Sequence, residues 1–169
     1  IDPKALKELT ICDQKLRNYF IERTIEENKD FLLCSLEEYD IQDQDLLFNL
    51  AMIEINRNPE WTVDIMSLCY QFKKFHILDE DKRIEIARAI VKKDPMSISS
   101  QIQEFSIHNQ KVLEELMTAA VDSPWGGAIS NLYMDIYGIE DPAARNRIKE
   151  AYKRSRHFKP SEPSQVAVN

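Results

Sequence analysis

The sequence feature that most constrains the fold is an internal repeat with a period of 30 to 36 residues. Five anchor residues, spaced by 30, 36, 30 and 32 positions, define it: Leu9, Tyr39, Phe75, Phe105 and Tyr137. Two residues after every anchor stands an isoleucine, and four residues after it stands an Asp or Asn. A repeat of this length is typical of stacked helical units that bury their apolar faces on one another.

The apolar pattern continues inside each unit. Eleven residues after the anchors come Phe20, Leu50, Ile86, Leu116 and Ile148. Sixteen residues after the first four anchors come Ile25, Ile55, Val91 and Val121. Three residues before each following anchor come Leu36, Phe72, Ile102 and Met134. Apolar residues that recur in helical phase indicate one buried stripe per helix.

Helix-start signals divide each unit into two helices. The Asp or Asn four residues after the anchor is a preferred N-cap, because its side chain accepts unpaired N–H groups of the first turn. A second start follows at Asn58-Pro59, Asp94-Pro95 and Ser123-Pro124, since Pro suits the first helical position. The pattern predicts first helices near 13–27, 43–56, 79–92 and 109–121, and second helices near 29–38, 59–74, 96–105 and 124–137. A ninth helix is expected from Asp141-Pro142 to about residue 156.

These elements predict an all-α protein: a right-handed α-solenoid of about four helix–turn–helix repeats plus a C-terminal helix. The helical-repeat domain is expected to span residues 1–157, and the Pro- and Ser-rich residues 158–169 are expected to form a disordered tail. Three cysteines without CxxC spacing, Cys12, Cys34 and Cys69, indicate free thiols in a reducing, cytoplasmic compartment. The sequence shows no apolar run of about 20 residues that would predict a membrane span.

No pattern in the sequence predicts catalysis. The histidines His76, His108 and His157 do not recur at one repeat position, and no HExxH, His/Cys cluster, EF-hand loop, P-loop or GxGxxG is found. Acidic pairs such as Glu37-Glu38 are expected to be solvated helix surface. We therefore predict a protein without enzymatic activity, metal or cofactor.

Two tryptophans are candidate binding residues. Trp61 and Trp125 both open predicted second helices, next to Pro59-Glu60 and Pro124. Trp is enriched in binding hot spots, but it is also a large core filler. Equivalent placement in two repeats favours the structural interpretation.

A basic segment closes the helical region, although the whole chain has a formal net charge of -7. Its seven cations are opposed by one acid, Glu150, and they are Arg145, Arg147, Lys149, Lys153, Arg154, Arg156 and Lys159. Such a segment is either the solvent-exposed end of a last helix, because cations near its C-terminus stabilise a helix, or a binding site for an acidic partner. The overall negative charge disfavours a general nucleic-acid binder.

The run from Phe75 to Ala87, together with Ser123-Pro-Trp-Gly-Gly127 and Tyr137-Gly-Ile139, resembles degenerate two-helix repeats. Repeats of this kind occur in large proteins of intracellular bacteria such as chlamydiae and legionellae, and the resemblance covers about residues 9–152. It implies a host-facing interaction or effector module, with delivery into a host cell. The chain also resembles the two-helix DNA-reading repeats of TAL effectors, but it lacks the repeated Gly and Lys of their inter-helix loop.

The sequence thus favours a non-catalytic protein–protein interaction module with a protein partner, because stacked repeats offer extended binding surfaces. Repeat-based nucleic-acid binding through the basic segment is one alternative. An accessory or regulatory domain of an enzyme, with the catalytic part elsewhere, is another, since the chain begins at Ile1 without a Met.

Overall fold

The computed structural model describes residues 14–27, 41–57, 62–70, 72–123 and 131–155. All secondary-structure elements in these ranges are helical, and no strand occurs among them, which confirms the predicted all-α class. The first helices of the units are α2 (Gln14–Glu27), α4 (Gln44–Arg57), α6 (Glu80–Lys93), α8 (Gln110–Asp122) and α10 (Pro142–Arg154). The second helices are α5 (Thr62–Tyr70), α7 (Pro95–Gln101) and α9 (Asn131–Ile136).

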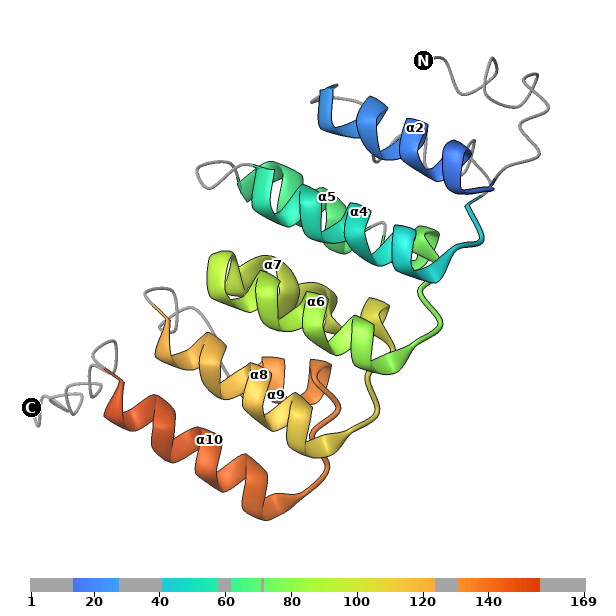
Figure 1. Ribbon diagram of the computed structural model, residues 1–169. Helices are drawn as coiled ribbons and strands as arrows, with labels where there is room; N and C mark the ends of the chain where they lie inside the picture. The colour runs from blue at the N-terminus through green and yellow to red at the C-terminus, as the bar shows by residue number, and fades with distance from the viewer. Residues whose placement is uncertain (1–13, 28–40, 58–61, 71, 124–130, 156–169) are drawn as a thin grey trace, which may run out of the picture.

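The helices form two layers (Figure 1). In one layer α2, α4, α6, α8 and α10 lie side by side in chain order, each packed on the next. In the other layer α5, α7 and α9 lie behind them, with α7 in contact with both α5 and α9. Every unit therefore contacts its sequence neighbours, as expected when no unit can bury its apolar face alone.

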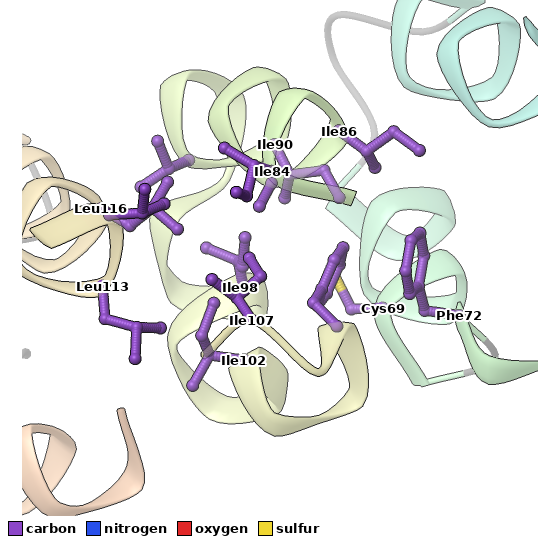
Figure 2. Close-up of a cluster of buried hydrophobic side chains, with 14 of the residues drawn as sticks. Cys69, Phe72, Ile84, Ile86, Ile90, Ile98, Ile102, Ile107, Leu113 and Leu116 are labelled. Carbon is purple, nitrogen blue, oxygen red and sulfur yellow. The ribbon is translucent and has the colours of Figure 1, made fainter. Parts of the chain in front are cut away.

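The predicted register agrees with the observed burial. Where the structure describes the side chain, the residues at the anchor, plus-two, plus-eleven, plus-sixteen and minus-three positions are buried, except Phe20 and Ile41, which are half-buried. Figure 2 shows part of this core, to which α6 contributes Ile84, Ile86 and Ile90, and α7 contributes Ile98. The predicted helix at 29–38, the first half of the one at 124–137 and the tail at 158–169 lie outside the described residues.

The predicted N-caps of α4, α6, α7, α8 and α10 are confirmed, whereas Asp13 and Asn58 lie outside the described residues. Asp43 accepts the N–H groups of Asp45 and Leu46 at 3.0 and 3.1 Å, and its other carboxylate oxygen accepts from Asn18 of the preceding unit at 2.7 Å. The equivalent residues Asp79, Asn109 and Asp141 cap α6, α8 and α10 in the same way. Asp94 caps α7 through the N–H of Ser97, with Pro95 in the first turn.

The ends of the second helices differ from the prediction of continuous α-helix. Short 3-10 helices, η2 (Phe72–Phe75) and η3 (Ile102–Phe105), close two of them. The tighter 3-10 turn places two aromatic rings against each other across the repeat boundary, with the centroids of Phe72 and Phe105 4.0 Å apart and stacked.

Each described anchor is followed by a residue with positive φ. His76 has φ 47°, Ser106 has φ 48° and Gly138 has φ 66°. In this left-handed region the backbone reverses, and it ends the second helix before the next first helix begins. The sequence pattern did not reveal this position because three different residue types occupy it.

Candidate interaction surfaces

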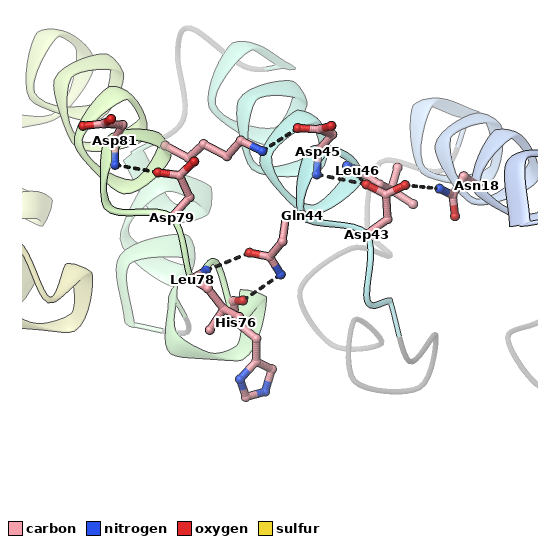
Figure 3. Close-up of polar contacts among 10 residues, drawn as sticks. Asn18, Asp43, Gln44, Asp45, Leu46, His76, Leu78, Asp79 and Asp81 are labelled. Atoms are coloured by element: carbon pink, nitrogen blue, oxygen red, sulfur yellow. Dashed lines mark hydrogen bonds and ion pairs between the residues drawn. The ribbon is translucent and has the colours of Figure 1, made fainter.

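Side chains at the start of the first helices bind the turn of the following unit. Gln44, the first residue of α4, accepts the N–H of Leu78 at 2.7 Å and donates to the carbonyl of His76 at 3.1 Å (Figure 3). Gln110, the first residue of α8, accepts the N–H of Glu140 at 3.1 Å and donates to the carbonyl of Gly138 at 3.0 Å. Gln44 and Gln110 thus bind equivalent backbone groups in two turns that are two units apart.

Glu80, the first residue of α6, completes the series. Its carboxylate accepts the N–H of His108 at 2.8 Å. This hydrogen bond is the main reason that the pKa of Glu80 lies below the ordinary value of 4.5. We call Gln44, Glu80 and Gln110 the turn clamps. They stand five residues after the anchor, a regularity that the search for apolar positions and caps missed.

Ion pairs also join neighbouring units in the first-helix layer. Arg88 of α6 makes a bidentate pair with Glu115 of α8 at 2.8 and 2.7 Å. Lys82 of α6 pairs with Asp45 of α4. These pairs are exposed on at least one side, so each contributes little stability alone but favours the observed register between units.

The basic segment lies on α10, where the structure describes five of its six predicted binding residues. Arg147 makes a bidentate pair with Glu114 of α8 at 2.6 and 2.8 Å, and the Arg147 guanidinium lowers the pKa of that carboxyl. Arg145 pairs with Asp135 at 2.5 Å and also donates to the carbonyl of Ile139. Two cations of the segment therefore bind the preceding unit.

The remaining residues of the basic segment are less constrained. Lys153 pairs with Glu150 one turn earlier on α10 at 2.8 Å, and Arg154 donates to the Glu150 carbonyl at 3.3 Å. Lys149 is exposed and makes no hydrogen bond or ion pair with the described residues. Arg156 lies outside the described residues. Most described cations of the basic segment are therefore already engaged in contacts within the chain.

Two equivalent grooves run along the edge where the turns lie. The first lies beside the turn after η2, and the second lies beside the turn after η3. Every residue that lines the first groove has the same repeat position as one that lines the second: Phe72, Lys73, His76, Ile77, Leu78, Arg83, Glu104 and Ser106. Across the first groove, the ammonium group of Lys73 donates to the Glu104 carboxylate at 3.1 Å. Across the second groove, the side-chain amide of Gln103 donates to the Ile136 carbonyl at 3.2 Å. These grooves mark the spaces between units that the turn clamps hold together.

The outward face of the second-helix layer has a different composition. The helices α5, α7 and α9 contain two charged residues, Asp64 and Asp135, whereas α6 alone contains eight. On α5 the side chains of Met66 and Tyr70 are 42% and 58% exposed, one helical turn apart. A charge-poor surface with exposed Met and Tyr has the composition of a protein interface core.

Partly exposed apolar side chains also occur on the other two second helices. Met96 of α7 has the same repeat position as Met66 of α5, and it is half-buried. Tyr133 of α9 is also half-buried. We call Met66, Tyr70, Met96 and Tyr133 the second-helix face. The predicted binding residues Trp61 and Trp125 precede α5 and α9 in the chain, and both lie outside the described residues.

Two buried polar groups, the Tyr137 hydroxyl and the Cys69 thiol, are held in their neutral form. Ser99 of α7 hydrogen-bonds the hydroxyl of the anchor Tyr137 at 3.0 Å, and burial raises the pKa of Tyr137 to about 12. Burial also raises the pKa of the free thiol of Cys69 to about 12, so that it is held as a neutral, unreactive group. Among the described residues there is no group of His, Cys, Asp and Glu that could hold a metal ion.

None of the described helices combines the length and the apolar character that crossing a bilayer requires. Comparison of the chain with protein-family models, with curated proteins and with solved structures finds no match.

Proposed function

We propose that this chain is a non-catalytic protein-binding module, a right-handed α-solenoid of about four two-helix repeats plus a C-terminal helix. The observation that carries the proposal is the contrast between the two layers. The first-helix layer is rich in charged residues, several of which form ion pairs between units, whereas the second-helix face is charge-poor and exposes Met66 and Tyr70. Interfaces are enriched in Tyr and Met and depleted in charge at their centres.

The edge of the molecule along which the turns between units lie is a weaker candidate for the partner-binding site. Leu78 is 77% exposed there, but the polar backbone groups of the turns are already bound by the clamps, as Gln44 binds those of His76 and Leu78. A partner at this edge would meet few free donors and acceptors. The second-helix face is therefore the proposed site of recognition.

Nucleic-acid binding remains the alternative proposal with less support. Phosphate contacts need free cations, whereas Arg145 and Arg147 are engaged by carboxylates of the preceding unit. A host-directed role in the cytoplasm, the setting that we propose for the module, rests on the sequence resemblance and on the free thiols.

The test is site-specific photo-crosslinking in a lysate of the source cells. A benzophenone amino acid at Tyr70 is expected to give a discrete protein adduct, and the same group at Asn49, an exposed residue of α4, is expected to give none. Met66→Lys should abolish the adduct at position 70, because it buries a charge in the interface core. An adduct at position 49 alone, or an adduct at position 70 that Met66→Lys leaves unchanged, would refute the second-helix face as the binding site.

A further inference from the structure

The inner first helices bury apolar side chains at two positions that face the units on either side. Twelve residues after the anchor stand Ala51, Ala87 and Met117, and each is at most 1% exposed. Sixteen residues after it stand Ile55, Val91 and Val121, and each is at most 5% exposed. Helices α4, α6 and α8 are thus apolar over a wide stripe, because each has a unit before it and a unit after it.

Helix α10 has lysines at both positions. Lys149 and Lys153 stand twelve and sixteen residues after Tyr137, and both are exposed. Asn146 is exposed at the position where α6 buries Ile84. Meanwhile Ile148 is 1% exposed, since it lies in the core that α10 shares with α8. The face of α10 that packs on α8 is therefore apolar, as in the inner first helices, whereas the face that carries Asn146, Lys149 and Lys153 is polar.

The turn clamp is also missing from α10. Pro142 stands at the position of Gln44, Glu80 and Gln110. Its ring has no donor or acceptor, so it cannot bind the backbone of a following turn. Three positions of α10, which lie five, twelve and sixteen residues after the anchor, therefore lack what the inner first helices have there.

We infer that α10 ends the stack: the face that carries Asn146, Lys149 and Lys153 does not accept another repeat unit. Stacking a unit there would bury the ammonium groups of Lys149 and Lys153, of which only Lys153 has a carboxylate partner, Glu150, and burying them is costly. The same lysines keep the corresponding face of a second copy of this chain from stacking on α10. Terminal units of repeat arrays need such a polar outer face to stay soluble.

The register of the repeat allows a direct test. Ser155 stands eighteen residues after its anchor, as Lys93 does, so a second copy of residues 94–123 inserted after Ser155 continues the repeat in phase. This insert carries α7, η3 and α8. Residues 156–169 follow it. One version keeps native α10, and a second gives it the residues of α6 through Pro142→Glu, Asn146→Ile, Lys149→Ala and Lys153→Val.

The measurement is the rate at which trypsin cleaves within the insert, followed by intact mass. We expect cleavage at least about tenfold slower on the α6-like helix than on native α10, because only a stacked unit is protected. A control with Lys149→Gln and Lys153→Gln removes both charges without adding apolar surface, so its insert should be cleaved at a rate between those on native α10 and on the α6-like helix. The four substitutions without the insert check that α10 itself stays folded.

Protection of the insert on native α10 equal to that on the α6-like helix would overturn the inference. Equal and rapid cleavage on both helices would also overturn it, because the residues named here would then not decide whether a unit stacks. Neither outcome depends on whether the second-helix face binds a partner.

Discussion

At the residue scale, each described turn between units has one residue whose backbone conformation is unfavourable for most residue types. The residue after each described anchor has positive φ, a region that costs a non-glycine residue on the order of 1 kcal/mol. Gly138 avoids this cost, but His76 and Ser106 do not. Backbone hydrogen bonds compensate in part, since Ser106 donates its N–H to the Gln103 carbonyl at 3.2 Å. The turns are therefore places where single substitutions change stability in a predictable direction.

Gly138→Ala should destabilise the protein by about 1 kcal/mol. A β-carbon at this position would meet no atom within 4 Å, so the cost is conformational and not steric. The reverse change, Ser106→Gly, should raise the free energy of unfolding by up to about 1 kcal/mol. Urea denaturation of both variants measures this pair of opposite shifts, and shifts of the same sign would contradict the argument.

At the element scale, the first helices are held to the next turn by an acceptor at their first residue. Two units use a neutral Gln, and one uses Glu80. A carboxylate and an amide oxygen accept the same backbone N–H, but only the carboxylate titrates. The clamp between α6 and the turn before α8 is thus the acid-sensitive one of the three.

This difference predicts a pH effect. The pKa of Glu80 is lowered, chiefly by the N–H of His108, so its ionised form adds stability above its unfolded-state pKa. That stability is lost as the pH falls from the ordinary value of 4.5 through the folded-state pKa. Urea midpoints measured from about pH 6 to about pH 3 should therefore fall less steeply for Glu80→Gln than for the wild type.

Glu85→Gln is the matched control for this titration. Glu85 is an exposed carboxylate on the same helix, and it accepts no hydrogen bond from a turn in the described part of the chain. Its variant should follow the wild-type profile. If Glu80→Gln also follows that profile, the carboxylate of Glu80 does not contribute through its charge.

At the scale of the whole molecule, the two layers are built from contacts between sequence neighbours. Each first helix packs on the next one, from α2 to α10, and α7 joins α5 to α9 (Figure 1). In such an arrangement stability is close to a sum over units and their interfaces. Removing one complete unit should then shorten the molecule without unfolding it.

Deletion of residues 76–105 tests this expectation. It joins Phe75 to Ser106, which has the same repeat position as His76, and removes α6, α7 and η3. The product should unfold cooperatively with a urea m-value reduced by roughly a fifth, because less surface is exposed on unfolding. Deletion of residues 76–90 breaks the register and should prevent folding. Loss of folding in both deletions would refute a modular stack.

The charge-poor second-helix face could have been found in the sequence, but it was not. The segment from Pro95 to Gln103 contains no charged residue. The basic segment, in contrast, was a candidate binding site because of its composition alone. Its sequence gives no sign that Arg147 reaches Glu114, 33 residues earlier, because that pairing depends on how close α8 and α10 lie.

The sequence by itself determined the first helices, the N-caps of α4, α6, α8 and α10, and the apolar positions that are buried in the described part of the chain. These follow from local rules: a cap needs only the first turn of its own helix, and a stripe needs only the helical period. Only the tertiary structure decided the turn clamps, the left-handed residues and the ion pairs between units. Each of these joins atoms of different units or of a reversing turn, so its partners are fixed by the distance and angle at which neighbouring units stack. The packing of the whole core sets this distance and angle, so they cannot be derived from the sequence of a single repeat.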